Sequence, residues 1–184
     1  MILTEWDYLK KEIHSENIPV TKGAKIMLSF KDKLKSGKNV FGPFWKTSSG
    51  ALVEVLGNAG FDFLIIDMEH GPHSVESVET LVRAANIRRV AAPVRVPENT
   101  ESAILRPLDR GASGVLVPHV SSGDEARKAK LASRFHPIGE RGMDIYARSA
   151  GYGKIPKEEY LTKANQETVV AIQIEGLEGA RGLE

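Results

Sequence analysis

The most informative segment of the chain is Phe61-Asp62-Phe63-Leu64-Ile65-Ile66-Asp67-Met68-Glu69-His70-Gly71-Pro72-His73. Its apolar run is long enough for one buried strand and ends in two carboxylates and a histidine, after which Gly71-Pro72 stops any regular continuation. A strand that is apolar on both faces is typical of a parallel sheet covered by helices, in which chemistry gathers at the carboxyl ends of the strands. We therefore expect Asp67, Glu69 and His70 to belong to a functional site.

The composition indicates one globular domain that binds a small molecule. The 184 residues are 41% hydrophobic and 27% charged, which allows a sizeable core. The 25 basic and 24 acidic residues leave a net charge of only +1, so the sequence predicts neither nucleic acid nor an anionic membrane as a partner. The absence of cysteine excludes a disulfide framework, a thiolate metal site and a cysteine nucleophile. No apolar run has the length of a membrane span and no signal peptide is recognisable, so we expect a cytoplasmic protein.

Segments of β and helical character alternate along the chain. Strands are predicted at 40–45, 61–66, 90–97, 114–120 and 168–176. Helices are predicted at 26–35, 47–56, 75–86, 100–108, 121–133 and 155–164, and a further short helix within 1–22. Ser74 is the expected N-cap of the third of these helices. The connection 135–153 is long enough that we expect it to have a function of its own.

Five β segments that alternate with helices predict a parallel sheet made of right-handed βαβ units. Two α/β architectures fit this pattern, an open doubly wound sheet and a TIM (β/α)8 barrel. No Gly-x-Gly-x-x-Gly sequence follows the first strand, which counts against a dinucleotide-binding sheet. The barrel interpretation divides the chain into an N-terminal extension, 1–22, and a partial barrel, 23–184, that contains only about the first five β/α units.

Polar side chains stand near the exits of four predicted strands: Asp67, Glu69 and His70, then Arg95, His119, and Gln173 with Glu175. Only a barrel brings several strand exits around one mouth. Gln173 and Glu175 lie two apart on a strand and point the same way, and a carboxylate suits Mg²⁺ or Mn²⁺. His70 is the natural base, because the reference pKa of imidazole, about 6.5, lies closest to neutrality. Arg95 offers a fixed positive fork for a carboxylate or an oxyanion.

These residues also have structural interpretations. The two carboxylates can cap a turn, an arginine can serve an ordinary ion pair, and a polar pair at a strand end can face solvent. Three further histidines, His73, His119 and His136, are interpreted as ordinary polar residues. The sequence Glu69-His70-x-x-His73 is not a zinc motif, because Gly71-Pro72 prevents the helix that would bring two histidines onto one face.

Six motifs in order are similar to those of the HpcH/HpaI aldolase family, from about Phe30 to the last residue. They are the segment 61–74, Pro93-Val94-Arg95-Val96-Pro97, Leu108-Asp109-Arg110-Gly111-Ala112, Val115-Leu116-Val117-Pro118, Gly139-Glu140-Arg141-Gly142 and Gln173-Ile174-Glu175. The family belongs to the phosphoenolpyruvate/pyruvate barrel superfamily and includes metal-dependent 2-keto-3-deoxy sugar acid aldolases and 4-hydroxy-2-oxoheptane-1,7-dioate aldolase. The resemblance implies a barrel fold and a class II lyase that forms pyruvate and an aldehyde without a lysine Schiff base.

The resemblance also implies roles for individual residues. His70 corresponds to the catalytic base, Asp67 to part of the same acidic strand end, Arg95 to the arginine that stabilises the pyruvate enolate, Asp109 to the aspartate that raises the basicity of the histidine, Gln173 to a substrate contact, and Glu175 to the first metal-ligating carboxylate. The implied cofactor is Mg²⁺, Mn²⁺ or Co²⁺. The implied partners are a small oxo-acid substrate and further copies of the chain, typically in a hexamer.

The match fails at one place. The second metal carboxylate of the family is an aspartate on the next strand, which this chain does not reach before Glu184. We therefore expect a truncated piece of a longer protein, or a barrel completed by another chain, with weak metal binding and little activity alone. Two other interpretations stay open at this point, a citrate-lyase-type acyl lyase and a non-catalytic remnant of the fold.

Overall fold

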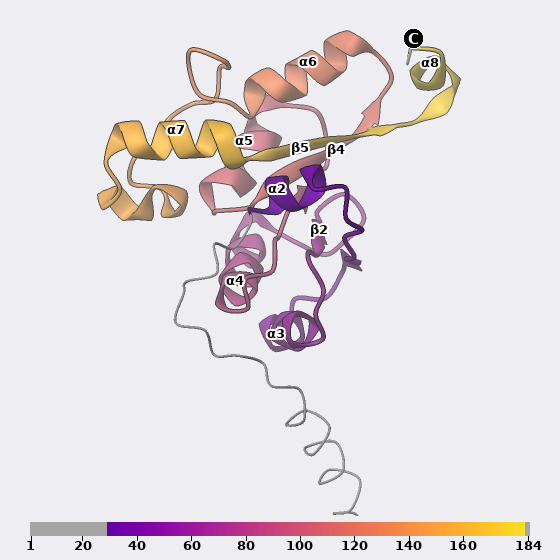
Figure 1. The fold of residues 1–184 in the computed structure, drawn as a ribbon. Helices are drawn as coiled ribbons and strands as arrows, with labels where there is room; N and C mark the ends of the chain where they lie inside the picture. Colours follow the sequence, from indigo (N-terminus) through magenta and orange to yellow (C-terminus); the bar gives the residue numbers. More distant parts are fainter. Residues whose placement is uncertain (1–28, 183–184) are drawn as a thin grey trace, which may run out of the picture.

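The computed structural model describes residues 29–182, which form a parallel sheet with helices packed around it (Figure 1). The strands are β1 (Phe44–Trp45), β2 (Ile65–Asp67), β3 (Val94–Arg95), β4 (Gly114–Val120) and β5 (Val169–Ile174). They are hydrogen-bonded in sequence order, β1-β2-β3-β4-β5, and every neighbouring pair is parallel. A doubly wound sheet reverses its strand order at a switch point, whereas this order never reverses. The sheet is therefore the arc of a barrel, as predicted.

Helices lie between the successive strands. The structure contains α2 (Phe30–Lys35), α3 (Gly50–Asn58), α4 (Val75–Ile87), α5 (Glu101–Asp109), α6 (Gly123–Ala132), α7 (Lys157–Glu167), α8 (Gly176–Arg181) and a 3-10 segment, η1 (Arg148–Gly153). The helices α3, α4, α5 and α6 begin at a hydroxyl N-cap, Ser49, Ser74, Thr100 or Ser122, whose side chain accepts a hydrogen bond from the N–H three residues on, and Ser29 caps α2 in the same way. These caps explain why the starts of α3, α4, α5 and α6 could be predicted from the sequence. In contrast, α8 lacks a side-chain cap and was not predicted.

The predictions for the first residues fall mostly outside the described part of the chain. The helix expected within 1–22 and the domain boundary between residues 22 and 23 both lie among residues that the structure does not describe. Of the helix predicted at 26–35, the described part begins at Phe30, after the N-cap Ser29. Among the described residues no helix has the length and hydrophobicity that crossing a membrane requires.

The first three strands are shorter than predicted, although they lie at the predicted places. Extended backbone hydrogen bonds continue past their ends, for example from the N–H of Leu64 to the carbonyl of Ala91 at 2.9 Å. Pro43 and Pro93 accept from Ile65 and Ile66 but have no N–H to donate, so the ladder is one-sided there. Hydrophobic patterning predicted where these strands lie, and the prolines limit the length over which β1 and β3 are hydrogen-bonded on both sides.

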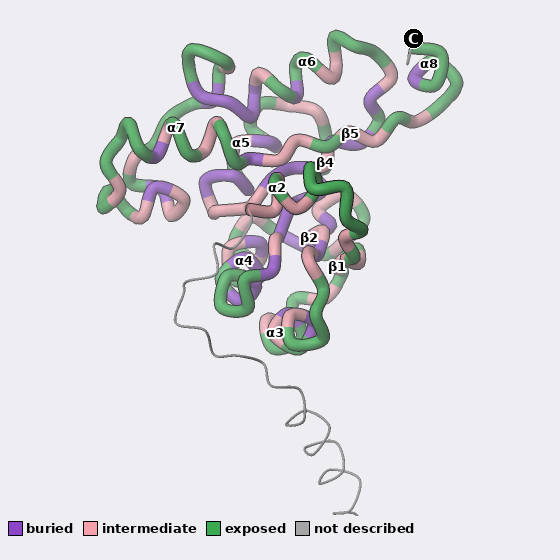
Figure 2. The backbone as a smooth tube through the Cα atoms, in the orientation of Figure 1, coloured by how far each residue is buried: buried purple, intermediate pink, exposed green. Residues whose placement is uncertain are grey.

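The core lies between the sheet and the helices that follow its strands. The interior side chains of the sheet, Ile66, Val94, Val115 and Val117, are fully buried in one cluster with helix residues that include Val53, Val78, Leu81 and Ile104. Figure 2 shows the buried residues gathered in β2, β3 and β4 and in parts of α3, α4 and α5, whereas β1 and β5 contain none. This rigid packing fixes the positions of the strand ends, where polar side chains emerge.

The two ends of the sheet differ in character. At the amino-terminal end, α2 packs against the residues that precede β2 and β5. The ring centroids of Phe30 and Phe63 are 5.4 Å apart, and Lys31 Nζ donates a hydrogen bond to the carbonyl of Gln166 at 2.7 Å. At the carboxyl end, the strands open into turns that carry charged side chains. The predicted site residues are concentrated at this second end.

Candidate active site

A tight turn after β2 holds Asp67 at the base of the site. The side chain of Asp67 is fully buried, and its Oδ1 accepts hydrogen bonds from the backbone N–H of Glu69 at 3.1 Å and of His70 at 3.0 Å. The turn needs glycine at position 71, because a Cβ there would lie 2.1 Å from the carbonyl oxygen of Asp67. The local sequence therefore folds back on Asp67, which places the side chain of Glu69 against Arg95 and leaves that of His70 exposed.

Arg95 forms a two-pronged ion pair with Asp67 across the sheet. The register of β2 and β3 places the two residues side by side, with Nε 3.0 Å from Oδ1 and Nη2 2.7 Å from Oδ2. Burial raises the pKa of Asp67, but the hydrogen bonds from Arg95 and from the N–H groups of His70 and Glu69 outweigh it and hold the pKa well below its ordinary value. Asp67 is thus a permanent anion that fixes the arginine.

The rest of the Arg95 guanidinium contacts the turn after β2, the strand β5 and the strand β1. Nη1 lies 3.1 Å from Glu69 Oε2 and donates to Gln173 Oε1 of β5 at 3.5 Å. The ring of Phe44 from β1 packs under the guanidinium, with Cζ 4.7 Å from the ring centroid. The hydrogen bonds to Asp67 raise the pKa of Arg95 further above its usual range, against the effect of burial. A fixed cation therefore joins β1, β2, β3 and β5.

His70 and Glu175 lie at the rim of this arrangement. The imidazole of His70 is 63% exposed, with Nε2 3.7 Å from Glu69 Oε1, so it is free to meet a substrate. Glu175 follows β5 and is partly exposed. The structure thus brings five of the six predicted site residues, Asp67, His70, Arg95, Gln173 and Glu175, to one end of the sheet.

His119 also belongs to this cluster, although the sequence pattern was interpreted otherwise. Its Nε2 lies 3.0 Å from Glu69 Oε1 and its Nδ1 2.6 Å from Glu175 Oε2. The pairing of β4 with β5 is irregular between Val117 and Val120, and His119 adopts the left-handed conformation with φ of 55°. The position of His119 near the end of a predicted strand was the feature of the sequence that could have placed it in this cluster.

Two more side chains at the strand exits were missed by the sequence analysis, Phe44 and Lys46. Lys46 immediately follows β1, and its Nζ lies 3.5 Å from Asp67 Oδ2. A search for the first polar residue after every predicted strand would have found it. The other two histidines agree with their interpretation: His73 is buried against the carbonyl of Trp45 at 3.0 Å, and His136 is exposed.

The expected role of Asp109 disagrees with its position in this chain. Asp109 is the last residue of α5, five positions before β4 begins, and therefore lies by the amino-terminal end of the sheet. Its carboxylate Oδ1 accepts a hydrogen bond from Arg141 Nη2 at 2.8 Å. Because the chain returns along α5 after β3, Asp109 and His70 are at opposite ends of the sheet. Asp109 does not orient the His70 of its own chain.

The donor set fits a divalent cation in part. Among the described residues no three His, Cys, Asp or Glu side chains are grouped closely enough to hold a metal ion. Glu175 nevertheless offers a partly exposed carboxylate beside His119, whose other ring nitrogen contacts Glu69. Mg²⁺ is usually held by one or two carboxylates, with waters and substrate oxygens as its other ligands. Glu175 fits that role, while Glu69-His70-x-x-His73 lies in a turn and makes no zinc motif.

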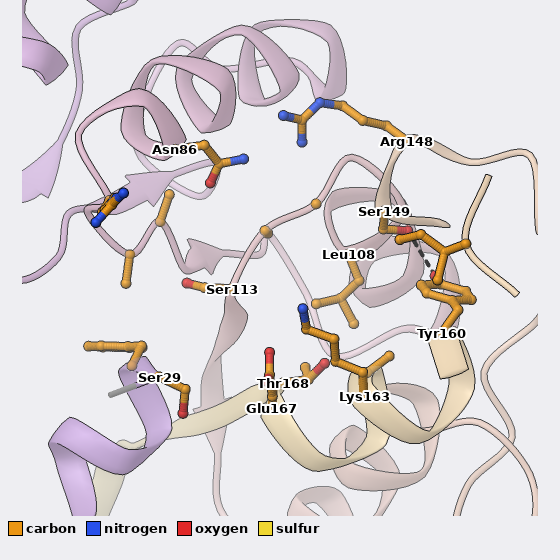
Figure 3. Close-up of a pocket in the computed structure, with 18 of the residues that line it drawn as sticks. Ser29, Asn86, Leu108, Ser113, Arg148, Ser149, Tyr160, Lys163, Glu167 and Thr168 are labelled. Atoms are coloured by element: carbon orange, nitrogen blue, oxygen red, sulfur yellow. Dashed lines mark hydrogen bonds between the residues drawn. The ribbon is translucent and has the colours of Figure 1, made fainter. Parts of the chain in front are cut away.

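A large cavity lies away from this site. It has a volume of about 750 Å³ and lies between α2, α7 and residues just before β3, β4 and β5. Figure 3 shows Ser113, just before β4, on one side, with Lys163 of α7 and its C-cap Thr168 lying together on another. It contains none of the predicted site residues. The polar cluster at the opposite end therefore remains the candidate active site.

Comparisons with known proteins identify the family. Residues 41–184 match the family model described as HpcH/HpaI aldolase/citrate lyase. The chain is 40% identical over 156 residues to the 4-hydroxy-2-oxo-heptane-1,7-dioate aldolase of Escherichia coli. The aligned residues cover 84% of this chain and 59% of the relative. The solved HpcH/HpaI aldolase from Desulfitobacterium hafniense DCB-2 is 28% identical with a TM-score of 0.78, over 84% of this chain and 60% of that one.

A second similar solved structure is that of a citrate synthase. Citrate synthase SbnG is 31% identical with a TM-score of 0.74, over 85% of this chain and 59% of that one. The chain thus spans about three fifths of the length of each of these relatives. The family model covers most of this sequence, and its strand-end cluster lies where the shared fold places chemistry. The chain belongs to the HpcH/HpaI aldolase/citrate lyase family.

Proposed function

We propose that the whole protein is a carbon–carbon lyase that reversibly cleaves a 4-hydroxy-2-oxo acid or a 2-keto-3-deoxy sugar acid into pyruvate and an aldehyde. One observation carries the proposal: Asp67, Arg95 and Gln173, from three strands of a chain in an aldolase family, meet at one end of the sheet. Polar groups at that end of a barrel are where the fold supports catalysis.

Arg95 is proposed to stabilise the charge that develops during cleavage. When the bond between C3 and C4 of the substrate breaks, its electron pair moves toward the C2 carbonyl, whose oxygen becomes negative. The guanidinium is already held by Asp67 and Glu69, so it meets this charge without reorganisation. Gln173 contacts the same guanidinium and helps to orient it.

His70 is proposed as the base. It accepts the proton of the C4 hydroxyl while that carbon becomes the aldehyde carbonyl, and C3 then takes up a proton to give pyruvate. Imidazole suits this task because it changes its protonation closest to neutral pH. Its exposure at the rim leaves it accessible to a substrate that reaches Arg95 from outside.

The proposed cofactor is a divalent cation, Mg²⁺, Mn²⁺ or Co²⁺. Such an ion supplies a Lewis acid that neutralises negative charge on the bound oxo acid. Glu175 is the residue of this chain that would hold it. Carboxylates discriminate weakly among these ions, so their availability decides which is used.

The proposed partners are a small oxo acid and further copies of the chain. The near-zero net charge of +1 gives no support for nucleic acid or an anionic membrane as a partner. By family resemblance the assembly is a homo-oligomer, with a hexamer as the expected size. We also propose a cytoplasmic location, since a chain without cysteine has no disulfide that would need an oxidising compartment.

Pyruvate release tests the proposal. The whole protein is incubated with 4-hydroxy-2-oxoheptane-1,7-dioate, and pyruvate is measured with lactate dehydrogenase and NADH, with added Mg²⁺, Mn²⁺ or Co²⁺ and with EDTA. We expect release that requires the divalent ion, because charge on the enolate must be neutralised. Pyruvate release that EDTA does not reduce would contradict the proposed divalent cofactor. The absence of pyruvate release under every condition would contradict the proposed lyase activity.

A second candidate function comes from the likeness to citrate synthase SbnG. That likeness favours chemistry in which an oxo acid is joined to, or released from, an acyl group. A second assay separates the two candidates: the protein is incubated with an oxo acid and a coenzyme A thioester, and release of the free coenzyme A thiol is measured beside pyruvate release. Turnover of thioesters without aldol cleavage would assign this alternative.

A further inference from the structure

Lys46 stands at the mouth of the site without a structural task that requires it. It follows β1 directly, and the pairing of Trp45 with Ile66 places it beside Asp67 at the end of β2. Its Nζ lies 3.5 Å from Asp67 Oδ2, and its side chain is 55% exposed. The ammonium group is therefore within reach of both Asp67 and solvent.

Lys46 faces the same side of the sheet as Arg95. Side chains two apart on extended backbone point the same way, so Lys46 follows the direction of Phe44. The ring of Phe44 lies under the Arg95 guanidinium, with Cζ 4.7 Å from the ring centroid. Lys46 and Arg95 also approach the same oxygen of Asp67. Two cations, from the ends of β1 and β3 on either side of β2, thus approach the same part of the site.

Asp67 is satisfied without Lys46. Its two oxygens accept four hydrogen bonds, from the N–H groups of Glu69 and His70 and from Nε and Nη2 of Arg95. The contact with Lys46 at 3.5 Å is longer than a good N–H···O hydrogen bond. Ion pairs with an exposed partner contribute little to stability, typically less than about 1 kcal/mol. The three donors of the ammonium are therefore available to a ligand.

We propose that Lys46 binds a second anionic group of the substrate, a carboxylate on the part that leaves as the aldehyde. This inference rests on the proposed function and names the substrate class that the site selects. Arg95 is locked by Asp67 and Glu69 and suits the reacting end of the molecule, whose position must be fixed. Lys46 is a point charge on a flexible stem and suits a carboxylate at a variable distance.

A matched pair of ligands tests this assignment. 2-Oxoadipate and 2-oxohexanoate have the same chain length and differ only in the distal carboxylate, so titration calorimetry with Mg²⁺ present isolates that group. We expect the protein to bind 2-oxoadipate about tenfold more tightly, since a charge-assisted contact is worth at least this much. Lys46→Met should reduce the ratio of the two dissociation constants to about 1, and Lys46→Arg should keep most of it.

Lys38→Met is the matched control, because Lys38 is exposed and has no side-chain contact among the described residues. It should leave the ratio unchanged. Equal binding of both acids by the unaltered protein, or an unchanged ratio in Lys46→Met, overturns the assignment. A loss of affinity for both acids alike also overturns it, because Lys46 would then serve the shared 2-oxo acid end. Failure of the unaltered protein to bind either acid contradicts the proposed function itself.

Discussion

Replacing Arg95 with methionine is expected to lower the free energy of unfolding by about 3–5 kcal/mol, because it leaves a buried carboxylate without its partner. Asp67 is fully buried and Arg95 nearly so, and two hydrogen bonds of 3.0 and 2.7 Å join them. Methionine fills a similar volume but supplies no charge. Arg95→Lys should recover only part of the loss, since an ammonium cannot make the two-pronged contact.

The pH dependence of this effect has a definite sign. The native pKa of Asp67 is depressed, so its contribution to stability is present above the unfolded value of about 3.9 and is lost as the pH falls through the native pKa. Denaturant unfolding of both proteins at several pH values measures the effect. We expect the difference between the unaltered protein and Arg95→Met to be full at pH 6 and to shrink below about pH 4.

Arg181→Met provides the control for this measurement. Arg181 is 74% exposed, and within residues 29–182 its only ion pair is with Glu178 three residues earlier, so its loss should change stability by less than about 0.5 kcal/mol. If Arg95→Met were as harmless as the control, the Asp67–Arg95 pair would not hold the strand ends together. A difference that grew on acidification would contradict the assigned ionisation of Asp67.

Replacing His70 with alanine is expected to reduce turnover by about 10²- to 10⁴-fold, which is what general bases contribute. The fold should be unaffected, because the side chain is 63% exposed and its backbone N–H, which bonds to Asp67, is retained. Pyruvate release and denaturant unfolding, measured on the same preparation, separate the two effects. The measurement is made with the substrate and ion that give the unaltered protein its highest rate.

His136→Ala serves as the control, since His136 is an exposed histidine away from the strand ends. It should retain normal turnover. A His70→Ala variant with unchanged turnover would mean that another group accepts the proton, and His119 would be the next candidate because it contacts both Glu69 and Glu175. Loss of turnover together with loss of stability would mean that His70 is structural.

Hydrophobic patterning and capping residues predicted the order and type of nearly every described element. The fourth strand, 114–120, was located residue for residue because it is a long apolar run between a glycine and a helix cap. The ion pair of Asp67 and Arg95 could not be predicted from the hydrophobic pattern, because it depends on the register of β2 and β3. That register is set by tertiary packing. Both residues were predicted for the site, but not as partners.

The differences between the predicted site and the geometry of the structure have physical causes. His119 was set aside because a regular strand gives no reason for its ring to turn toward Glu175, and only the irregularity in β4 does so. Lys46 was missed because the first strand was judged by its apolar residues alone. Asp109 received its role from family resemblance, whereas its place at the end of α5 gives it Arg141 as a partner.

The most direct test of the account is calorimetric titration of pyruvate in the presence and absence of Mn²⁺, for the unaltered protein and for Glu175→Gln. The account predicts that Mn²⁺ tightens pyruvate binding by at least about tenfold, through a shared site at the strand ends, and that Glu175→Gln removes this coupling. Pyruvate affinity that is independent of Mn²⁺, or coupling that survives in Glu175→Gln, would contradict it.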